Sequence, residues 1–187
     1  MSVRRPRRER PPLDAATLNE LALRYVGRFA TTRAKLKTYL ARKVRERGWG
    51  DSPGPNLEML VERFAERGYV DDAGFAMSKS RSLTARGYGK QRVVQSLRVA
   101  GVRDDDGAEA RAHADEEAVT AALRYARRKR IGPYAAARGD ISERQKALAA
   151  MVRAGHNFAL GRAIVELAPG EEPDEELLRE AAGRSTD

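Results

Sequence analysis

The side chains most able to do chemistry in this sequence are cations grouped around a glycine-rich turn. Arg86, Tyr88 and Lys90 share this turn with Gly87 and Gly89, whose lack of a side chain would let a phosphate backbone come close. Guanidinium and ammonium groups bind phosphates through charge-assisted hydrogen bonds, and a tyrosine ring offers a surface for base stacking. The chemistry indicated is recognition of a nucleic acid or a nucleoprotein. The candidate contact residues are Lys79, Arg81, Arg86, Tyr88, Lys90, Arg92 and Arg98.

These cations also have a plainer interpretation, as a solvated helix face opposite an apolar stripe. Arg81 and Arg92 lie among polar neighbours, away from the apolar positions. This placement fits both phosphate contact and a solvated helix face. Trp49 and Tyr69 directly follow helix-terminating glycines, and we expect them to pack against the core rather than to contact a partner.

Residues suited to catalysis or metal binding are sparse. The two histidines, His113 and His156, have no metal-ligand spacing, and we expect them to be ordinary surface or joint residues. Asp71 and Asp72 are explained by their place at the start of a helix. The run 104–106 is three adjacent aspartates, without the alternating oxygens of a calcium loop. With no GxxxxGK[ST] phosphate loop either, we expect no enzyme, no cofactor and no metal, so that a partner would perform any nucleotide hydrolysis.

The charge of the chain is uneven along its length. The net charge is +9, but residues 1–103 carry 23 Lys or Arg against 10 Asp or Glu, whereas residues 104–187 carry 13 against 17. We expect the basic half to face phosphates. A basic composition can also reflect an arginine-rich, alanine-rich genome rather than a function.

Composition also bounds the setting of the protein. Cysteine is absent, which excludes disulfides and thiolate metal sites. The sequence has no apolar leader, and its apolar runs are shorter than the roughly 20 residues that a membrane span needs. We expect a soluble, cytoplasmic protein that does not bind a membrane.

The stretch 68–102 is the most specific in residue order, and it predicts two helices and the joint between them. Asp71 is suited to cap the first helix, with Val70 and Phe75 at the two positions of a hydrophobic staple. The helix should end within 86–89, where glycines release the backbone. In the second helix the residues at helical spacing, followed by the expected terminating glycine, are Val93, Val94, Leu97, Ala100 and Gly101.

This stretch resembles the signature of the RecX family, regulators of the RecA recombinase. The matching residues are Gly68, Tyr69, Val70, Asp71, Asp72, Phe75 and Ala76, then an arginine-rich helix, then Gly89, Arg92, Val93, Leu97, Gly101 and Val102. The resemblance extends more loosely from about Asp14 to Leu167.

The resemblance implies a function. It implies binding along the groove of a RecA filament on single-stranded DNA, with contacts to both protein and DNA. The consequence would be inhibition of strand exchange, ATP hydrolysis and coprotease activity during homologous recombination, DNA repair and the SOS response. It implies tandem three-helix repeats as the fold, and we expect the protein to act as a monomer.

Apolar periodicity places further helices on either side of this stretch. They are expected over residues 14–29, 32–48, 56–68, 103–114, 115–130, 141–154 and 158–167, with caps at Thr31 or Thr32, Asn56 and Asn157, and a capping box of Ser142 and Gln145. The sequence thus predicts a basic disordered arm over 1–13, three-helix repeats over 14–69, 70–114 and 115–168, and a disordered acidic tail over 169–187 with at most one short helix near Leu177 and Leu178.

An internal period supports the three repeats. Gly48, Gly101 and Gly155 are 53 and 54 residues apart, and each follows apolar residues at helical spacing. Such a period is typical of a tandem helical array whose units depend on one another for burial. The predicted fold is all-α, with three tandem three-helix repeats in an elongated, curved array.

Two alternatives remain open on sequence alone. Short helices joined by glycine-containing turns are also typical of a helix-turn-helix protein acting directly on duplex DNA, although no helix carries the usual mixture for base readout. A basic scaffold for acidic proteins or RNA is the other. We also expect the acidic tail to fold back on the basic half and to lower non-specific DNA binding.

Overall fold

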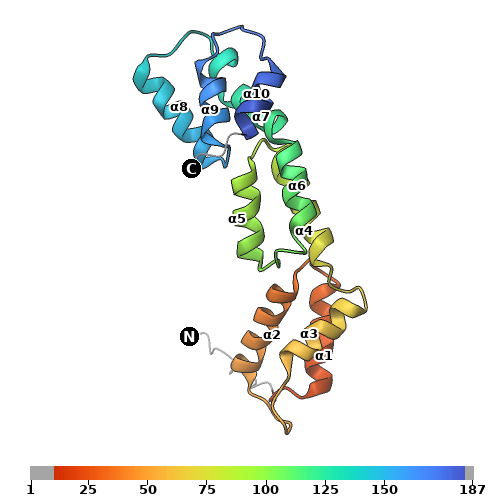
Figure 1. The fold of residues 1–187 in the computed structure, drawn as a ribbon. Helices are drawn as coiled ribbons and strands as arrows, with labels where there is room; N and C mark the ends of the chain where they lie inside the picture. The colour runs from red at the N-terminus through yellow and green to blue at the C-terminus, as the bar shows by residue number, and fades with distance from the viewer. Residues whose placement is uncertain (1–10, 184–187) are drawn as a thin grey trace, which may run out of the picture. The chain divides into compact units, whose positions relative to one another are not determined.

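The computed structural model describes residues 11–183, and this part of the chain is all-α, as predicted. It contains ten α-helices and one short 3-10 helix, and none of these helices is long and apolar enough to cross a membrane. The chain divides after Asp72 into two compact units (Figure 1). Residues 1–10 of the expected basic arm lie outside the described range.

The first unit contains three helices around one core: α1 (Ala15–Val26), α2 (Arg33–Arg47) and α3 (Leu57–Glu66). Asp14, Thr32 and Asn56 each accept a hydrogen bond from a backbone amide in the first turn of the helix that follows. These caps satisfy amides that have no partner within the helix. The caps predicted at Thr32 and Asn56 are confirmed. The core residues are Leu13, Leu18, Ala22, Leu36, Leu40, Leu60, Val61, Phe64 and Val70.

Leu13 was assigned by its sequence context to the disordered arm, and this is wrong. Its side chain is fully buried in the first core. Its backbone amide donates to Gly48 O at 3.0 Å, and its carbonyl accepts from the amide of Gly50 at 2.8 Å, beside an isolated bridge to Trp49. Burial of the leucine side chain and pairing of both its backbone groups lower the free energy of the ordered state. Residues of an exposed arm make neither contribution.

Asp72 ends the first unit and begins α4 (Asp72–Ala85). Its side chain is almost completely buried, and Oδ1 accepts from the Arg33 amide, the first residue of α2, at 2.9 Å. The Arg33 guanidinium lies 3.7 Å from Oδ2. Asp72 therefore places its carboxylate at the positive end of α2 as well as in the first turn of α4.

The second helix group comprises α4, α5 (Lys90–Ala100) and α6 (Ala108–Glu116), with a core of Ala76, Leu83, Val93, Leu97, Ala110 and Ala114. Of the predicted apolar positions of α5, Val93, Leu97 and Ala100 are buried and Val94 is half-buried, and Gly101 ends the helix in the left-handed conformation at φ 69°. Ser80, fully buried on α4, donates to Ala110 O of α6 at 2.8 Å. The repeat boundary expected after residue 114 falls inside α6, which continues to Glu116.

The third helix group comprises α7 (Ala118–Lys129), η1 (Gly132–Tyr134), α8 (Ile141–Arg153), α9 (Phe158–Glu166) and α10 (Glu175–Gly183). The short helix expected near Leu177 and Leu178 is present as α10, so these residues do not belong to a disordered tail. This helix packs against α7 and α9 (Figure 1) and buries Leu178 in the third core. Burial of one leucine outweighs an acidic composition here.

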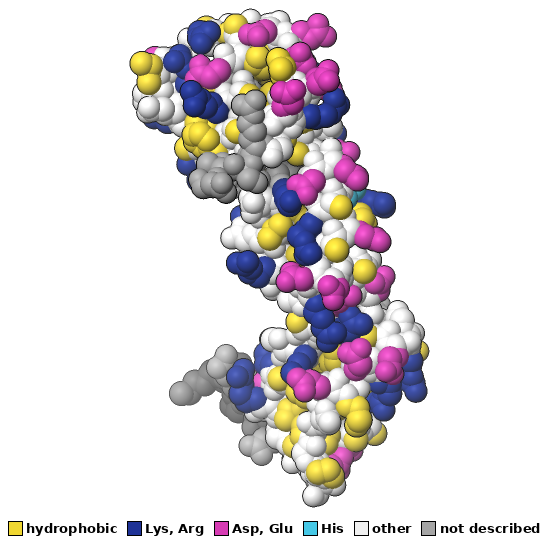
Figure 2. Space-filling model, viewed as in Figure 1, with side chains coloured by type: hydrophobic (Ala, Val, Ile, Leu, Met, Phe, Trp, Pro, Cys, Tyr) yellow, Lys and Arg dark blue, Asp and Glu magenta, His cyan; other side chains and the backbone are white. Residues whose placement is uncertain are grey.

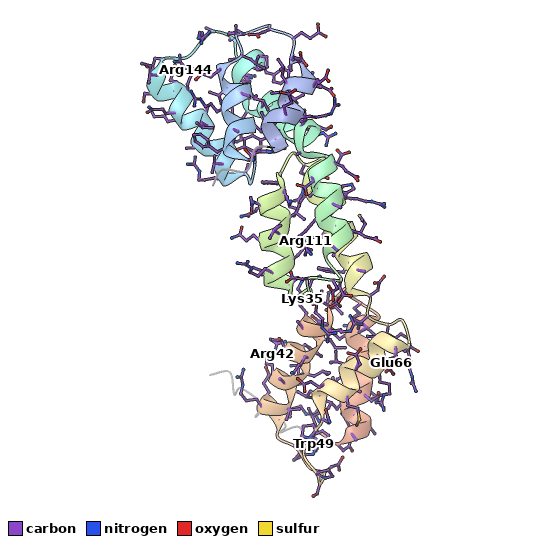
Figure 3. All side chains as sticks on the ribbon, in the orientation of Figure 1. Lys35, Arg42, Trp49, Glu66, Arg111 and Arg144 are labelled. Atoms are coloured by element: carbon purple, nitrogen blue, oxygen red, sulfur yellow. The ribbon has the colours of Figure 1, made fainter. Side chains whose placement is uncertain are left out.

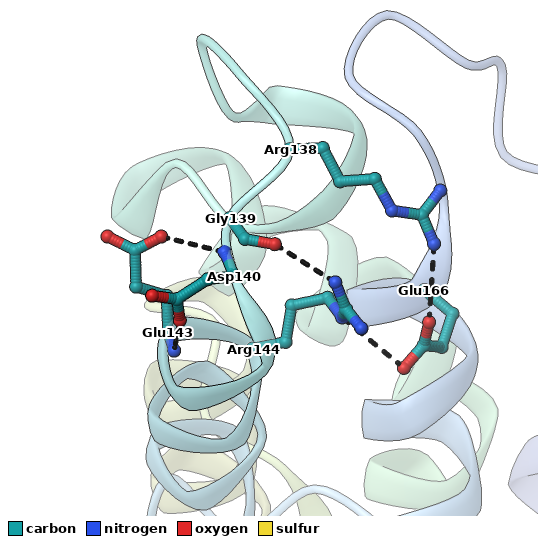
Figure 4. A network of polar contacts seen from close by, with 6 residues as sticks. All are labelled: Arg138, Gly139, Asp140, Glu143, Arg144 and Glu166. Carbon is teal, nitrogen blue, oxygen red and sulfur yellow. Dashed lines mark hydrogen bonds and ion pairs between the residues drawn. The ribbon is translucent and has the colours of Figure 1, made fainter.

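The start of α8 differs from the predicted capping box of Ser142 and Gln145. The box consists of Asp140 and Glu143: Asp140 Oδ1 accepts from the Glu143 amide at 2.8 Å, and Glu143 Oε2 accepts from the Asp140 amide at 2.9 Å (Figure 4). Both pairs have the right spacing, but a carboxylate is the stronger acceptor at the positive end of a helix.

A polar network joins this helix start to the end of α9 (Figure 4). Arg144 donates to Gly139 O at 2.9 Å and lies 3.8 Å from Glu166, the last residue of α9. Arg138 approaches the other oxygen of Glu166 at 3.6 Å. One carboxylate thus holds both the loop before α8 and the first turns of α8.

The three predicted glycine positions share a positive φ. Gly48, Gly101 and Gly155 follow α2, α5 and α8, and their φ values of 78°, 69° and 92° are accessible at little cost only to glycine. This agreement is consistent with the predicted three repeats.

Candidate nucleic-acid interface

The candidate site of the second unit is centred on Tyr88, in the turn between α4 and α5. Three guanidinium groups lie near its ring: Arg86 at 5.6 Å, Arg92 at 6.0 Å and Arg128 at 5.9 Å from the centroid. We call these four residues the Tyr88 cluster. Tyr88 is half-buried and packs against both the second and the third cores, so the cluster has a rigid base.

Backbone carbonyls at the end of α4 hold the arginines in place. Arg86 Nε donates to Ser82 O at 3.0 Å, and Arg128 donates to Arg86 O. Arg124, one turn earlier on α7, donates to Thr84 O at 3.0 Å. The last carbonyls of a helix carry partial negative charge and lack partners within the helix, which favours cations at this position.

The glycines of the turn do not serve the purpose expected from the sequence. A Cβ on Gly89 would lie 2.3 Å from Gly155 O, and one on Gly87 would lie 2.9 Å from the Tyr125 amide. Both glycines are buried. The close approach that they permit is to the third helix group rather than to a phosphate backbone, and this is a correction to the sequence-based reasoning.

His156 closes the same joint. Its imidazole is buried, with Nε2 3.1 Å from Gly87 O and its ring 5.5 Å from that of Tyr125. Burial lowers its pKa to about 4, more than the hydrogen bond to Gly87 O raises it. The imidazole is therefore neutral at pH 7 and packs as a joint residue, one of the two roles expected for it.

Lys90 is partly neutralised. Its Nζ lies 2.6 Å from Asp115 Oδ2, and the two side chains are 39% and 55% exposed. An exposed pair of this kind exchanges partners readily and contributes little stability. The pair lies at the edge of a pocket of about 360 Å³ whose lining includes Gln91, His156 and Phe158.

The remaining candidates do not join the Tyr88 cluster. Lys79 is half-buried on α4, whereas Arg81 and Arg98 are exposed on α4 and α5. On the face shown in Figure 2, basic and acidic side chains are interspersed over each unit. Among the described residues this face therefore carries no continuous basic surface, and any cationic site on it must be local. The cluster brings together Arg86, Tyr88 and Arg92 from the predicted set.

Arg128 was missing from the predicted set. The sequence shows it only as one of several cations at the end of a helix, where they suit the helix dipole. A weak signal was present, because Arg124 and Arg128 are four residues apart and share one face of α7. Nothing local indicates that this face meets a turn 40 residues earlier.

The fold and the cluster together define a class: an all-α protein with local cationic surfaces, in which residues 11–183 contain no grouping of side chains suited to hold a metal ion. The chain is 33% identical over 174 residues to a protein of Myxococcus xanthus described as regulatory protein RecX, covering 89% of this chain and 91% of that one. The chain belongs to the RecX family.

Further comparisons agree with this assignment. A regulatory protein RecX of Mycobacteroides abscessus is 29% identical over 166 residues, covering 88% of this chain and 79% of the relative. A crystal structure of RecX from Lactobacillus salivarius has the same fold, with a TM-score of 0.58 at 16% identity over 81% of this chain and 94% of that one. No protein-family model matches the chain.

Proposed function

We propose that this protein is a negative regulator of the RecA recombinase that binds the RecA filament on single-stranded DNA. It inhibits strand exchange, ATP hydrolysis and coprotease activity, and it acts as a monomer without a metal or cofactor. The observation that carries the proposal is the match to a regulatory protein RecX along nearly the whole of both chains.

The Tyr88 cluster supports this function physically. Three guanidinium groups lie around one ring, two of them held by backbone carbonyls and that of Arg92 by the Gln95 side chain. They form a preorganised cationic surface, which suits a filament rich in phosphates. Inhibition requires that the protein bind one state of the filament more tightly than another, since a ligand shifts an equilibrium only through such a difference.

The test is a titration of RecA ATPase activity on single-stranded DNA with the wild type and with R86E/K90E/R92E. The triple variant should inhibit at least about tenfold less well, because three attractive contacts become repulsive, each worth roughly 1 kcal/mol or more. Its helical circular dichroism should be unchanged.

A matched control reverses three exposed cations elsewhere in the second unit, as K146E/R153E/R162E. This variant has the same net charge and should inhibit as the wild type does. Equal loss in both variants would show that only net charge matters and would remove the site assignment. Sequence-specific duplex binding without any effect on the ATPase would instead select the helix-turn-helix alternative.

A further inference from the structure

A second aromatic and cationic surface lies in the first unit, on α1, α2 and the loop between them. The rings of Tyr25 and Tyr39 are stacked with centroids 4.2 Å apart, and the Phe29 ring, tilted by 51°, lies 5.5 Å from that of Tyr25. We call these three rings the aromatic ladder. It contains none of the residues of the Tyr88 cluster and lies in the other compact unit of the chain.

The ladder has one open end. Tyr25 and Tyr39 are half-buried and pack against the first core, which explains their positions. Phe29 is 58% exposed, and it is neither a member of that core nor one of the hydrophobic residues packed against it. A phenylalanine exposed in this way beside a stacked pair leaves one ring surface available to a further planar group.

The other end of the ladder is cationic. Arg42 and Lys43 of α2 each lie 5.8 Å from the centroid of the Tyr39 ring, and Figure 3 labels Arg42 and Lys35 along this helix. Glu46 lies 2.6 Å from Lys43 and 3.8 Å from Arg42, so one acid partly neutralises two cations.

Charge around the ladder strongly favours an anionic partner. Residues 24–47 contain nine Lys or Arg and a single acid, and α2 alone carries seven against one, a net +6 in a chain whose total is +9. Arg28, beside Phe29, and Arg45 are exposed and make no side-chain ion pair within residues 11–183. Basic grooves that combine such charge with exposed rings are typical of surfaces that bind single strands, whose bases are free to stack.

We propose that the aromatic ladder is a binding site for single-stranded DNA, in which an unpaired base stacks on Phe29 and neighbouring phosphates contact Arg28 and the cations of α2. Duplex DNA lacks a free base face for Phe29. The proposal shares single-stranded DNA with the proposed function, but it is tested without recombinase, so either can fail alone.

The test measures binding of the purified full chain to a fluorescent oligothymidine and to an abasic strand of the same length, which retains the phosphates. Phe29→Ala should weaken binding to oligothymidine roughly tenfold, as loss of one stacked base does, and should leave binding to the abasic strand unchanged. Met59→Ala, which removes an exposed apolar side chain of the same unit, should change neither.

Two further variants separate stacking from general hydrophobic contact. Phe29→Leu should bind as weakly as Phe29→Ala, whereas Phe29→Trp should bind at least as well as the wild type. The fluorescence of Phe29→Trp, after subtraction of the signal from the single native Trp49, should be quenched by oligothymidine but not by the abasic strand.

Several outcomes would overturn the proposal. They are unchanged oligothymidine affinity in Phe29→Ala, wild-type affinity in Phe29→Leu, or equal loss on the abasic strand. If Phe29→Ala failed to fold, absence of quenching in Phe29→Trp would still decide against it. Binding of oligouridine with no binding of oligothymidine would make RNA the partner and the assignment to DNA wrong.

Discussion

At the residue scale, His156 shows how the fold determines what a side chain can do. Its imidazole is buried between Gly87 O and the Tyr125 ring, and burial lowers its pKa to about 4 from the ordinary 6.5. Trp49 and Val102 occupy the corresponding positions after Gly48 and Gly101. The position after the helix-terminating glycine is therefore occupied by a packing residue in each helix group, and a neutral imidazole can pack there.

This pKa predicts acid sensitivity. Between pH 6.5 and 4 the unfolded state binds a proton at His156 that the folded state does not. The free energy of unfolding should therefore decrease as the pH is lowered from 6.5 to 4. A difference of about 2.5 pKa units corresponds to at most about 3 kcal/mol. Denaturant unfolding at pH 7 and pH 4.5 would measure the loss.

The control is His156→Phe. This variant leaves Gly87 O without its partner, so it should be about 1–2 kcal/mol less stable at pH 7, but its stability should depend less on pH in the same window. Asp14, whose pKa is lowered by its hydrogen bonds from Thr17, titrates at lower pH and should not mask the comparison. An equal pH dependence in both proteins would contradict the assignment to His156.

Residue identity alone could not have completed the candidate site. Arg86 is predictable because it shares a glycine-rich turn with Tyr88, and Arg92 because it lies on the polar face of the next helix, whereas Arg128 comes from a helix about 40 residues away. Its contact depends on how α7 crosses the end of α4. That crossing relies on the buried Gly87, where a Cβ would lie 2.9 Å from the Tyr125 amide of α7, and a glycine in a sequence does not show which backbone it allows to come close.

At the element scale, α10 is present where one short helix was expected, but its packing against the third core was not predicted. Its acidic composition resembles that of a disordered segment, and only Leu178 and the two alanines near its end favour packing. Helices with a regular apolar stripe and a cap, such as α3 and α5, were predicted correctly. A helix whose stability comes mostly from tertiary burial leaves little trace in local sequence.

Leu178 and Leu177 form a matched pair for testing α10. Leu178 is 3% exposed and Leu177 is 61% exposed on the same helix. Leu178→Ala should lower the free energy of unfolding by about 2–4 kcal/mol, as expected for a buried leucine, and Leu177→Ala by less than about 0.5 kcal/mol. Chemical denaturation of the two variants would measure this. Equal, near-zero effects would show that the helix does not pack.

At the scale of the whole molecule, the second and third helix groups form one compact unit because their joint is made of backbone. The amides of Gly89 and Gln91 donate to Ala154 O at 3.0 Å and to Gly155 O at 3.1 Å, respectively. No side chain separates the two chain segments there. We therefore expect residues 73–183 to unfold as one cooperative body.

Gly89→Ala tests this joint. A Cβ at this position would meet Gly155 O, which is backbone and cannot rotate away, so the variant should lose about 1–3 kcal/mol or more of stability. Hydrogen exchange at the Gln91 amide should become faster. Gly54→Ala, where nothing lies within 4 Å of the new Cβ, should be nearly neutral in thermal melting. Equal melting temperatures for the two variants would contradict the tight joint.

Charge at this scale is also more local than the total suggests. The sequence placed the candidate site in the second helix group, because its turn holds glycines and a tyrosine. However, α2 of the first unit is the most basic helix and carries a net +6. Composition predicted a cationic protein correctly. Which cations lie beside which aromatic rings depends on side-chain distances between helices, and the apolar periodicity of a sequence does not predict these distances.

The polar network of Figure 4 has a practical consequence. Before the exposed Ala136 and Ala137, the Pro133 carbonyl accepts from the Gly170 amide at 2.9 Å; after them, Arg138 and Arg144 both engage Glu166. The chain is therefore held on both sides of this bend. Extra residues between two anchored points cost little closure entropy. A dye or affinity handle inserted at this bend would let the protein be followed or immobilised while leaving both cationic surfaces chemically intact.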